Sequence, residues 1–319
     1  MAKSKTATTA QRQDAPKEAW AHPETKLKRL SKKDYLQTLE LWSSTVLTIS
    51  TPGTPPQEPL AALVQLEPLL VKIPRAADRR EHIDMKGVRV SVLHESIYFL
   101  HKAWHVAASC AQHVKGGRLT WAEIDSYQSA LFSMGAVLGL LGITFPSQHA
   151  VIDVWPSPVQ DSKKGIALSS ASDEIQLIGF QSLDHYVKWS ILKRVLRTCT
   201  PGSIAHDTGM AIADIRDTSF ADRRNGVLYQ ARKWLHKDLF QPTSVDEFGR
   251  SESRAELFDS LRQQDENFSI SLMLALLNLG HQMASTIGAL SGTVAAELKL
   301  VEPHSKEVST LWAECGIAN

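Results

Sequence analysis

Arg224, Asn225 and Tyr229 are the residues of this chain whose types and spacing point to chemistry. An arginine presents a fork of N–H donors that fits a phosphate group, and the N-terminus of a helix also attracts anions. The sequence predicts a helix that begins after a cap at 219–222 and runs to about residue 239, which places Arg224 and Asn225 near its start. This arrangement favours contact with a nucleic-acid backbone and does not by itself establish catalysis.

The geometry of that helix separates the arginine from the phenol. Five residues correspond to about 500° of rotation, so Arg224 and Tyr229 point about 140° apart on an ideal helix. A phosphate pocket that uses both therefore fits the seam of a homodimer, where two copies contribute. The alternative is structural: Arg224 pairs with Asp217 or Asp222, Asn225 holds a loop, and Tyr229 belongs to the core.

The surroundings of this motif are basic. Residues 184–237 contain ten Lys or Arg and five Asp. Lys193 and Arg197 lie four residues apart, on the same side of the expected helix. Trp189 and Trp234 add aromatic rings that are able to stack on bases. The candidate nucleic-acid-binding residues are Lys193, Arg197, Arg223, Arg232 and Lys233. A solvated helical face gives the same pattern.

His236 is a second candidate for proton transfer. It lies four residues after Arg232, so the two share a helical face beyond Tyr229. Its spacing from Arg224 differs from that of the family discussed below.

Composition limits the function classes. Lys+Arg number 35 and Asp+Glu 34, so any nucleic-acid surface must be a local patch. Cys110, Cys199 and Cys315 form no CxxC pair, which is typical of reduced thiols in a cytoplasmic protein. The chain has no glycine-rich phosphate loop, nucleophile elbow or dinucleotide fingerprint, so no cofactor is expected.

The pattern of apolar residues predicts an almost wholly helical, all-α fold with one interruption. Residues 1–30 read as a disordered tail without a secretory apolar run, 31–87 as an N-terminal helical segment, and 88–319 as a helical bundle. The interruption at 144–179 is either a long irregular loop or a small β insertion with a strand near 150–155. The expected helices are 31–49, 60–71, 88–114, 120–143, 183–196, 219–239, 254–262, 266–300 and 305–315.

Three local features refine these boundaries. Thr120 to Glu123 read as a capping box that opens the helix 120–143. The uncharged stretches 126–146 and 269–296 are long enough to cross a bilayer, but the second carries several polar side chains, so we interpret both as buried central helices and expect no membrane contact.

Three histidines follow one helical stripe. His94, His101 and His105 lie close to one side of the helix 88–114, and the last two have the spacing of metal ligands. Glu95 is offset from that stripe, so the pattern is not an HExxH zinc site. A histidine-rich seam between helices is the favoured interpretation, and no metal is assigned.

The segment Tyr127-Gln128-Ser129-Ala130-Leu131-Phe132, continuing to 138–143, resembles a core helix of the HEPN superfamily. Those proteins are all-α domains of prokaryotic defence and toxin systems. The later Arg224-Asn225-x-x-x-Tyr229 resembles that superfamily's signature of an arginine and a polar residue followed by a histidine. The order of the two motifs also agrees, and the resemblance covers about residues 88–239.

The resemblance implies a metal-independent site that cleaves RNA across a symmetric dimer. In the family the arginine holds the scissile phosphate and the histidine acts on the ribose 2′-hydroxyl. Here Tyr229 takes the place of the histidine, and a phenol, which titrates near 10, is a poor general base at neutral pH.

Three functions follow as hypotheses. The first is a HEPN-like protein with a degenerate site that binds RNA or a partner protein, in a setting of antiviral defence. The second is an active metal-independent endoribonuclease that uses Arg224 with Tyr229 or His236. The third is a purely structural helical scaffold.

Overall fold

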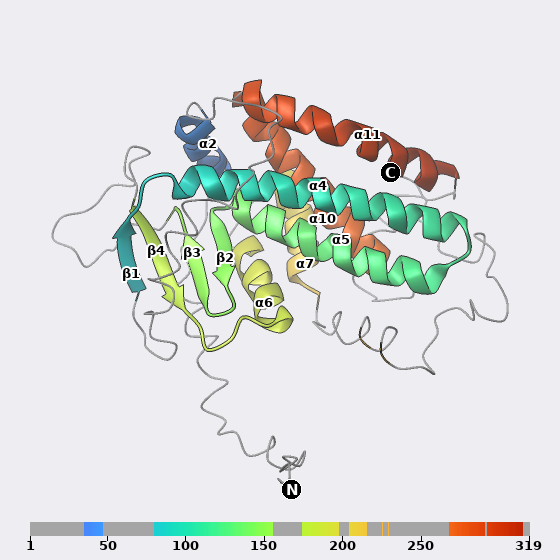
Figure 1. The fold of residues 1–319 in the computed structure, drawn as a ribbon, viewed down its shortest axis with the longest axis horizontal. Coiled ribbons are helices and arrows are strands. Elements are labelled where there is room, and N and C mark those ends of the chain that lie inside the picture. The colour runs from blue at the N-terminus through green and yellow to red at the C-terminus, as the bar shows by residue number, and fades with distance from the viewer. Residues whose placement is uncertain are drawn as a thin grey trace, which may run out of the picture.

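The computed structural model gives a mostly helical molecule with a small antiparallel sheet at one end (Figure 1). Of the described residues, 76% are helical, in seven helices, which confirms the expected helical fold with a small β insertion. The structure describes residues 35–46, 80–155, 174–197, 204–215, 225, 229, 268–290 and 292–314. The expected helices at 60–71 and 254–262 lie outside these residues.

A long helical hairpin forms the centre of the molecule. α4 (Val88–Lys115) and α5 (Leu119–Leu140) lie side by side and present buried faces to each other. They approach closely at Gly139, where a Cβ would stand 2.0 Å from Ser96 Oγ. The range expected for α4 is confirmed to within one residue at its end, because Gly116 and Gly117 stop the helix as the sequence indicates.

The capping box expected at the start of α5 is wrong. Arg118 occupies the N-cap without a side-chain hydrogen bond, and Thr120 is buried inside the first turn. Glu123 is also buried, and its Oε1 accepts a hydrogen bond of 2.5 Å from Ser269 Oγ. A tertiary contact therefore uses the carboxylate that the local pattern assigned to a cap.

The end of α5 also differs from expectation. The helix ends at Leu140 rather than at Ile143, because Gly142 adopts a φ of 84° and its N–H bonds to Gly139 O at 2.8 Å. This left-handed residue after a helix turns the chain directly into β2, which begins at Ile143.

The sheet contains four antiparallel strands in the order β1-β4-β3-β2. The strands are β1 (Arg80–Asp84), β2 (Ile143–Ser147), β3 (Ala150–Asp153) and β4 (Glu174–Gly179). The β alternative for the 144–179 segment is thus confirmed in its described part. The strand β1 was not expected. It reads Arg-Glu-His-Ile-Asp, and such a polar run carries no strand signal on its own.

The C-terminal part is a pair of helices, α10 (Phe268–Leu290) and α11 (Gly292–Glu314). The expected division into 266–300 and 305–315 is wrong, because α10 ends at Leu290, α11 begins at Gly292, and Pro303 lies inside α11. Within the described residues α10 is the one helix long and apolar enough to cross a membrane. Most of its apolar side chains are buried against neighbouring helices, as expected for a core helix.

Three shorter helices complete the described fold. α2 (Tyr35–Val46) packs on α10 and α4, and α6 (His185–Leu196) begins at Asp184, whose carboxylate caps Val187 N at 2.8 Å. Both were expected from the sequence. α7 (Ile204–Ala213) was not, and it packs between α6 and α10.

Candidate nucleic-acid interface

Asn225 and Tyr229 are the two described residues of the predicted phosphate motif. Both are helical and, being four residues apart, they share a face. Tyr229 is 75% exposed, which corrects the interpretation that it belongs to the core. Asn225 is half-buried, and its Oδ1 has no hydrogen-bond partner within the part of the chain that the structure describes. Arg223, Arg224, Arg232, Lys233 and His236 lie outside the described residues.

Lys193 and Arg197 lie together on α6 and hold the end of α7. Lys193 Nζ donates to Ile215 O, and Arg197 Nη2 donates to Ala213 O at 2.9 Å. The carbonyls at a helix C-terminus lack partners inside the helix and carry partial negative charge, so cations stabilise them. Arg197 also lies 3.9 Å from Asp214 Oδ1, in an ion pair that leaves 57% of the arginine side chain exposed.

Tyr186 extends this basic face and was missed from the sequence. It lies seven residues before Lys193 and eleven before Arg197, so the three follow one side of α6. Tyr186 is 53% exposed. We call Tyr186, Lys193 and Arg197 the α6 stripe. Trp189, by contrast, is 1% exposed, so the expectation that its ring stacks on bases is wrong.

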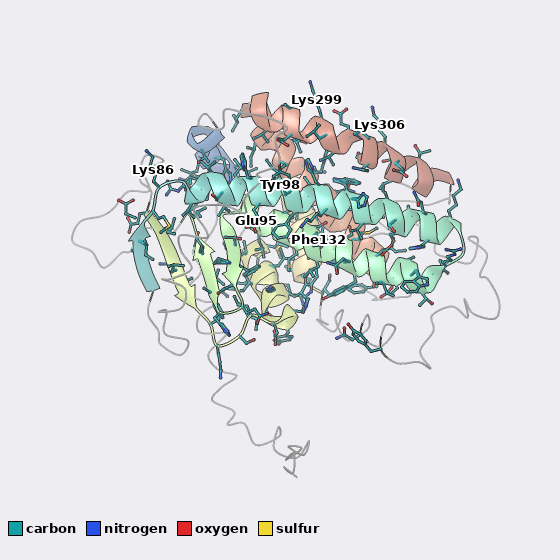
Figure 2. The ribbon with its side chains drawn as sticks, in the orientation of Figure 1. Lys86, Glu95, Tyr98, Phe132, Lys299 and Lys306 are labelled. Carbon is teal, nitrogen blue, oxygen red and sulfur yellow. The ribbon has the colours of Figure 1, made fainter. Side chains whose placement is uncertain are left out.

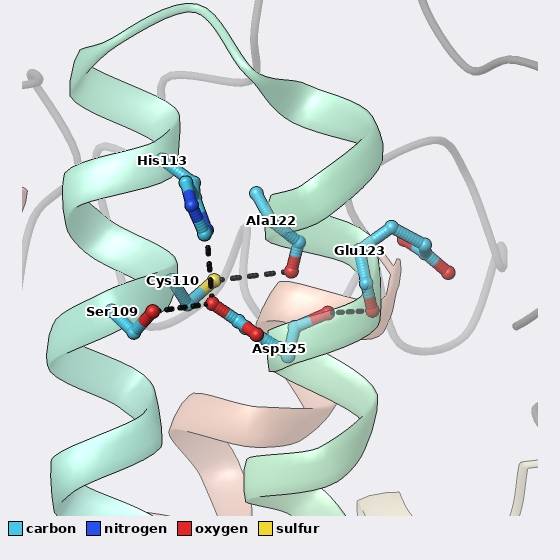
Figure 3. Close-up of polar contacts among 7 residues, drawn as sticks. Ser109, Cys110, His113, Ala122, Glu123 and Asp125 are labelled. Carbon is cyan, nitrogen blue, oxygen red and sulfur yellow. Dashed lines mark hydrogen bonds and ion pairs between the residues drawn. The ribbon is translucent and has the colours of Figure 1, made fainter. Parts of the chain in front are cut away.

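A second polar cluster joins α4 to α5 (Figure 3). Ser109 Oγ donates to Asp125 Oδ2 at 2.7 Å, and His113 Nδ1 lies 2.9 Å from the same oxygen. A nucleophilic triad needs a serine bonded to the histidine, whereas here both side chains bond to one carboxylate. We therefore interpret the cluster as a link between the two helices.

Cys110 lies beside this cluster and is sealed in the core. Its Sγ–H donates to Ala122 O at 3.2 Å, and the residue has no exposed surface. Burial raises the pKa of the Cys110 thiol well above its ordinary value of 9.0, and the nearby carboxylates of Asp125 and Glu123 raise it further. A thiol in this state is a poor nucleophile.

The three histidines of α4 face α11, as the seam interpretation expects. The rings of His105 and His304 meet edge to face with centroids 5.5 Å apart, and Tyr98 lies 5.8 Å from His101. In the described ranges no three His, Cys, Asp or Glu side chains are placed to hold a metal ion.

Comparisons of the chain with protein-family models, curated proteins and solved structures give no match.

Proposed function

We propose that this chain is a HEPN-like helical protein that binds single-stranded RNA through the helix carrying Asn225 and Tyr229. The observation that carries the proposal is the exposure of Tyr229, at 75%. A phenol held open on a helix presents a flat ring to a base, and such stacking contributes about 1–3 kcal/mol per base. The α6 stripe supports the proposal with an exposed phenol and two cations on one helical face.

Binding without cleavage is the form of the function that these residues favour. A phenol is a poor general base compared with an imidazole, so Tyr229 is a weak replacement for the superfamily's histidine at a ribose 2′-hydroxyl. The proposal includes a homodimer in which Arg224 of one copy and Tyr229 of the other meet, since an ideal helix would point the two about 140° apart. Antiviral defence is the setting that the superfamily resemblance adds to the proposal.

Fluorescence anisotropy of the full chain with a short labelled oligouridine in EDTA tests this proposal. We expect binding that weakens with added salt and leaves the RNA intact on a denaturing gel. Replacing Tyr229 by alanine should weaken binding about tenfold through lost stacking, whereas Tyr229→Phe should retain most of the affinity. Trp121→Ala is the matched control, because Trp121 is an exposed aromatic residue (49%) on α5.

Two outcomes would contradict the proposal in different ways. Absence of binding at low salt would remove RNA as the ligand. Cleavage in EDTA that disappears in Arg224→Ala would instead establish the endoribonuclease.

A further inference from the structure

α11 lies along the outer side of the molecule and packs on α4 and α10 (Figure 1). The side of α4 that it covers is rich in histidine. His94, Tyr98, His101 and His105 lie at successive turns on one side of α4. Glu297, Val301, His304 and Val308 repeat the same spacing on α11. His281 of α10 closes the third side, where its ring meets Trp104 edge to face at 5.9 Å. We call this contact region the histidine seam.

Three ring nitrogens in and beside the histidine seam lack hydrogen-bond partners. His101 Nε2, His281 Nδ1 and Trp104 Nε1 are buried and have no hydrogen-bond partner among the described residues. A neutral imidazole with one unpartnered nitrogen costs little more than a lost hydrogen bond, but an imidazolium at the same place is a buried charge. Burial of these rings therefore favours the neutral form of the histidines.

The net effect of the seam is to lower the pKa values of its buried histidines. Burial lowers the pKa values of His94, His101 and His281 below the ordinary value of 6.5. Carboxylates of α11 oppose this, Glu297 at His94 and His101 and Glu302 at His281, but the effect of burial is larger. The nearby ring of His304 adds to the lowering at His101. A hydrogen bond with the Glu297 backbone also opposes the lowering at His101.

The sign of the pH dependence follows from these directions. A histidine released from the seam returns toward a pKa of 6.5, so below that pH the released form binds protons more readily than the packed form. Packing of α11 is therefore at full strength above pH 6.5 and weakens as the pH falls toward the lowered pKa values.

α11 lies at the periphery of the molecule and buries one side. Its buried apolar residues are Val294, Leu298, Val301 and Val308, while Lys299 and Lys306 point outward from its free side (Figure 2). Pro303 removes one backbone hydrogen bond from its middle, next to His304. A peripheral helix with one buried side and an internal proline opens at lower free energy than the central hairpin.

We propose that the histidine seam is a pH-sensitive latch: mild acidification releases α11 from α4 and α10 and uncovers the apolar face that it shields. The latch involves neither Asn225 nor Tyr229, so it stands or fails independently of RNA binding. Protonation of each histidine shifts the opening equilibrium of α11 by up to about tenfold per pH unit between the ordinary pKa and the lowered one, and no further below that window.

Hydrogen exchange of the full chain, read by mass spectrometry at about pH 7.5 and about pH 5.5 and corrected for the chemical rate, tests the latch. We expect peptides of α11 to lose at least tenfold in protection at the lower pH while peptides of α5 keep theirs. Equal protection of α11 at both values would overturn the proposal. Simultaneous loss in α5 and α11 would also overturn it, because that is global unfolding.

Variants separate the seam from other titrating groups. His101→Phe combined with His281→Phe keeps two rings and removes two titrations, so the pH response of α11 should shrink. Glu297→Gln removes a carboxylate that favours the charged histidines, so release should begin at a higher pH. His149→Gln is the control, because His149 lies on the turn between β2 and β3 and should leave the response unchanged. Should the double variant fail to fold, the exchange of the wild type at the two pH values and that of Glu297→Gln still test the latch.

Discussion

Replacing Trp42 by alanine should lower the free energy of unfolding by about 3–5 kcal/mol, the range observed for truncation of a buried aromatic residue. Trp42 has no exposed surface, and its ring meets Trp155 edge to face with centroids 5.1 Å apart. Its Nε1–H also donates to Leu140 O at 2.8 Å. That carbonyl belongs to the last turn of α5, where the helix offers it no partner. One side chain of α2 thus connects the end of α5 to the segment that follows β3.

Urea denaturation of the full chain measures this effect. Trp42→Phe keeps an aromatic ring and removes the donor, so it should cost only about 1–2 kcal/mol. Ser43→Ala, at the exposed neighbouring position of α2, should stay within about 0.5 kcal/mol of the wild type. A loss in Trp42→Ala no larger than that of Ser43→Ala would show that α2 does not pack as described.

Gly142→Ala should destabilise the chain by about 2–4 kcal/mol, through two causes that act together. The φ of 84° at Gly142 is strained for any residue with a Cβ. The added Cβ would also stand 2.5 Å from Trp155 Cδ1 and 3.2 Å from Val154 Cγ2. Trp155 is fixed between Trp42 and the Arg89 guanidinium, which lies 4.0 Å above its ring, so it has little room to move.

Gly292→Ala provides the matched control for this substitution. Gly292 begins α11, and a Cβ there would meet nothing within 4 Å. Thermal unfolding should show a lower Tm for Gly142→Ala and an unchanged Tm for Gly292→Ala. An unchanged Tm in both variants would mean that the turn from α5 into β2 is not as described.

Local sequence signals were sufficient for the helices that have local ends. α4 was predicted almost to the residue, because its apolar spacing is regular and two glycines close it. The errors arise where a distant contact decides. Glu123 looks like a capping residue until Ser269 takes its carboxylate, and Pro303 looks like a helix end until α11 packs through it. β1 is a strand only because β4 pairs with it.

The candidate interface was predictable only in part, for a similar reason. Trp189 and Tyr186 lie three residues apart on α6, and composition alone treats them alike. Helical phase distinguishes them: Trp189 aligns with the buried Leu192 and Leu196, whereas Tyr186 aligns with Lys193 and Arg197. The apolar spacing of the sequence does not show that Lys193 and Arg197 bind backbone carbonyls at the end of α7, because it does not predict α7 itself.

The order of strands has a kinetic consequence. Gln176 on β4 contacts His82 on β1 across 94 positions of sequence, and between these strands the chain completes the whole α4–α5 hairpin. Closing so long a loop is entropically costly until the hairpin has brought its ends together. We therefore expect β1 to be the final strand to join the sheet during refolding and the first to fray. Pulsed hydrogen exchange during refolding measures when each amide becomes protected. Protection of the β1 amides before those of α4 would contradict this order.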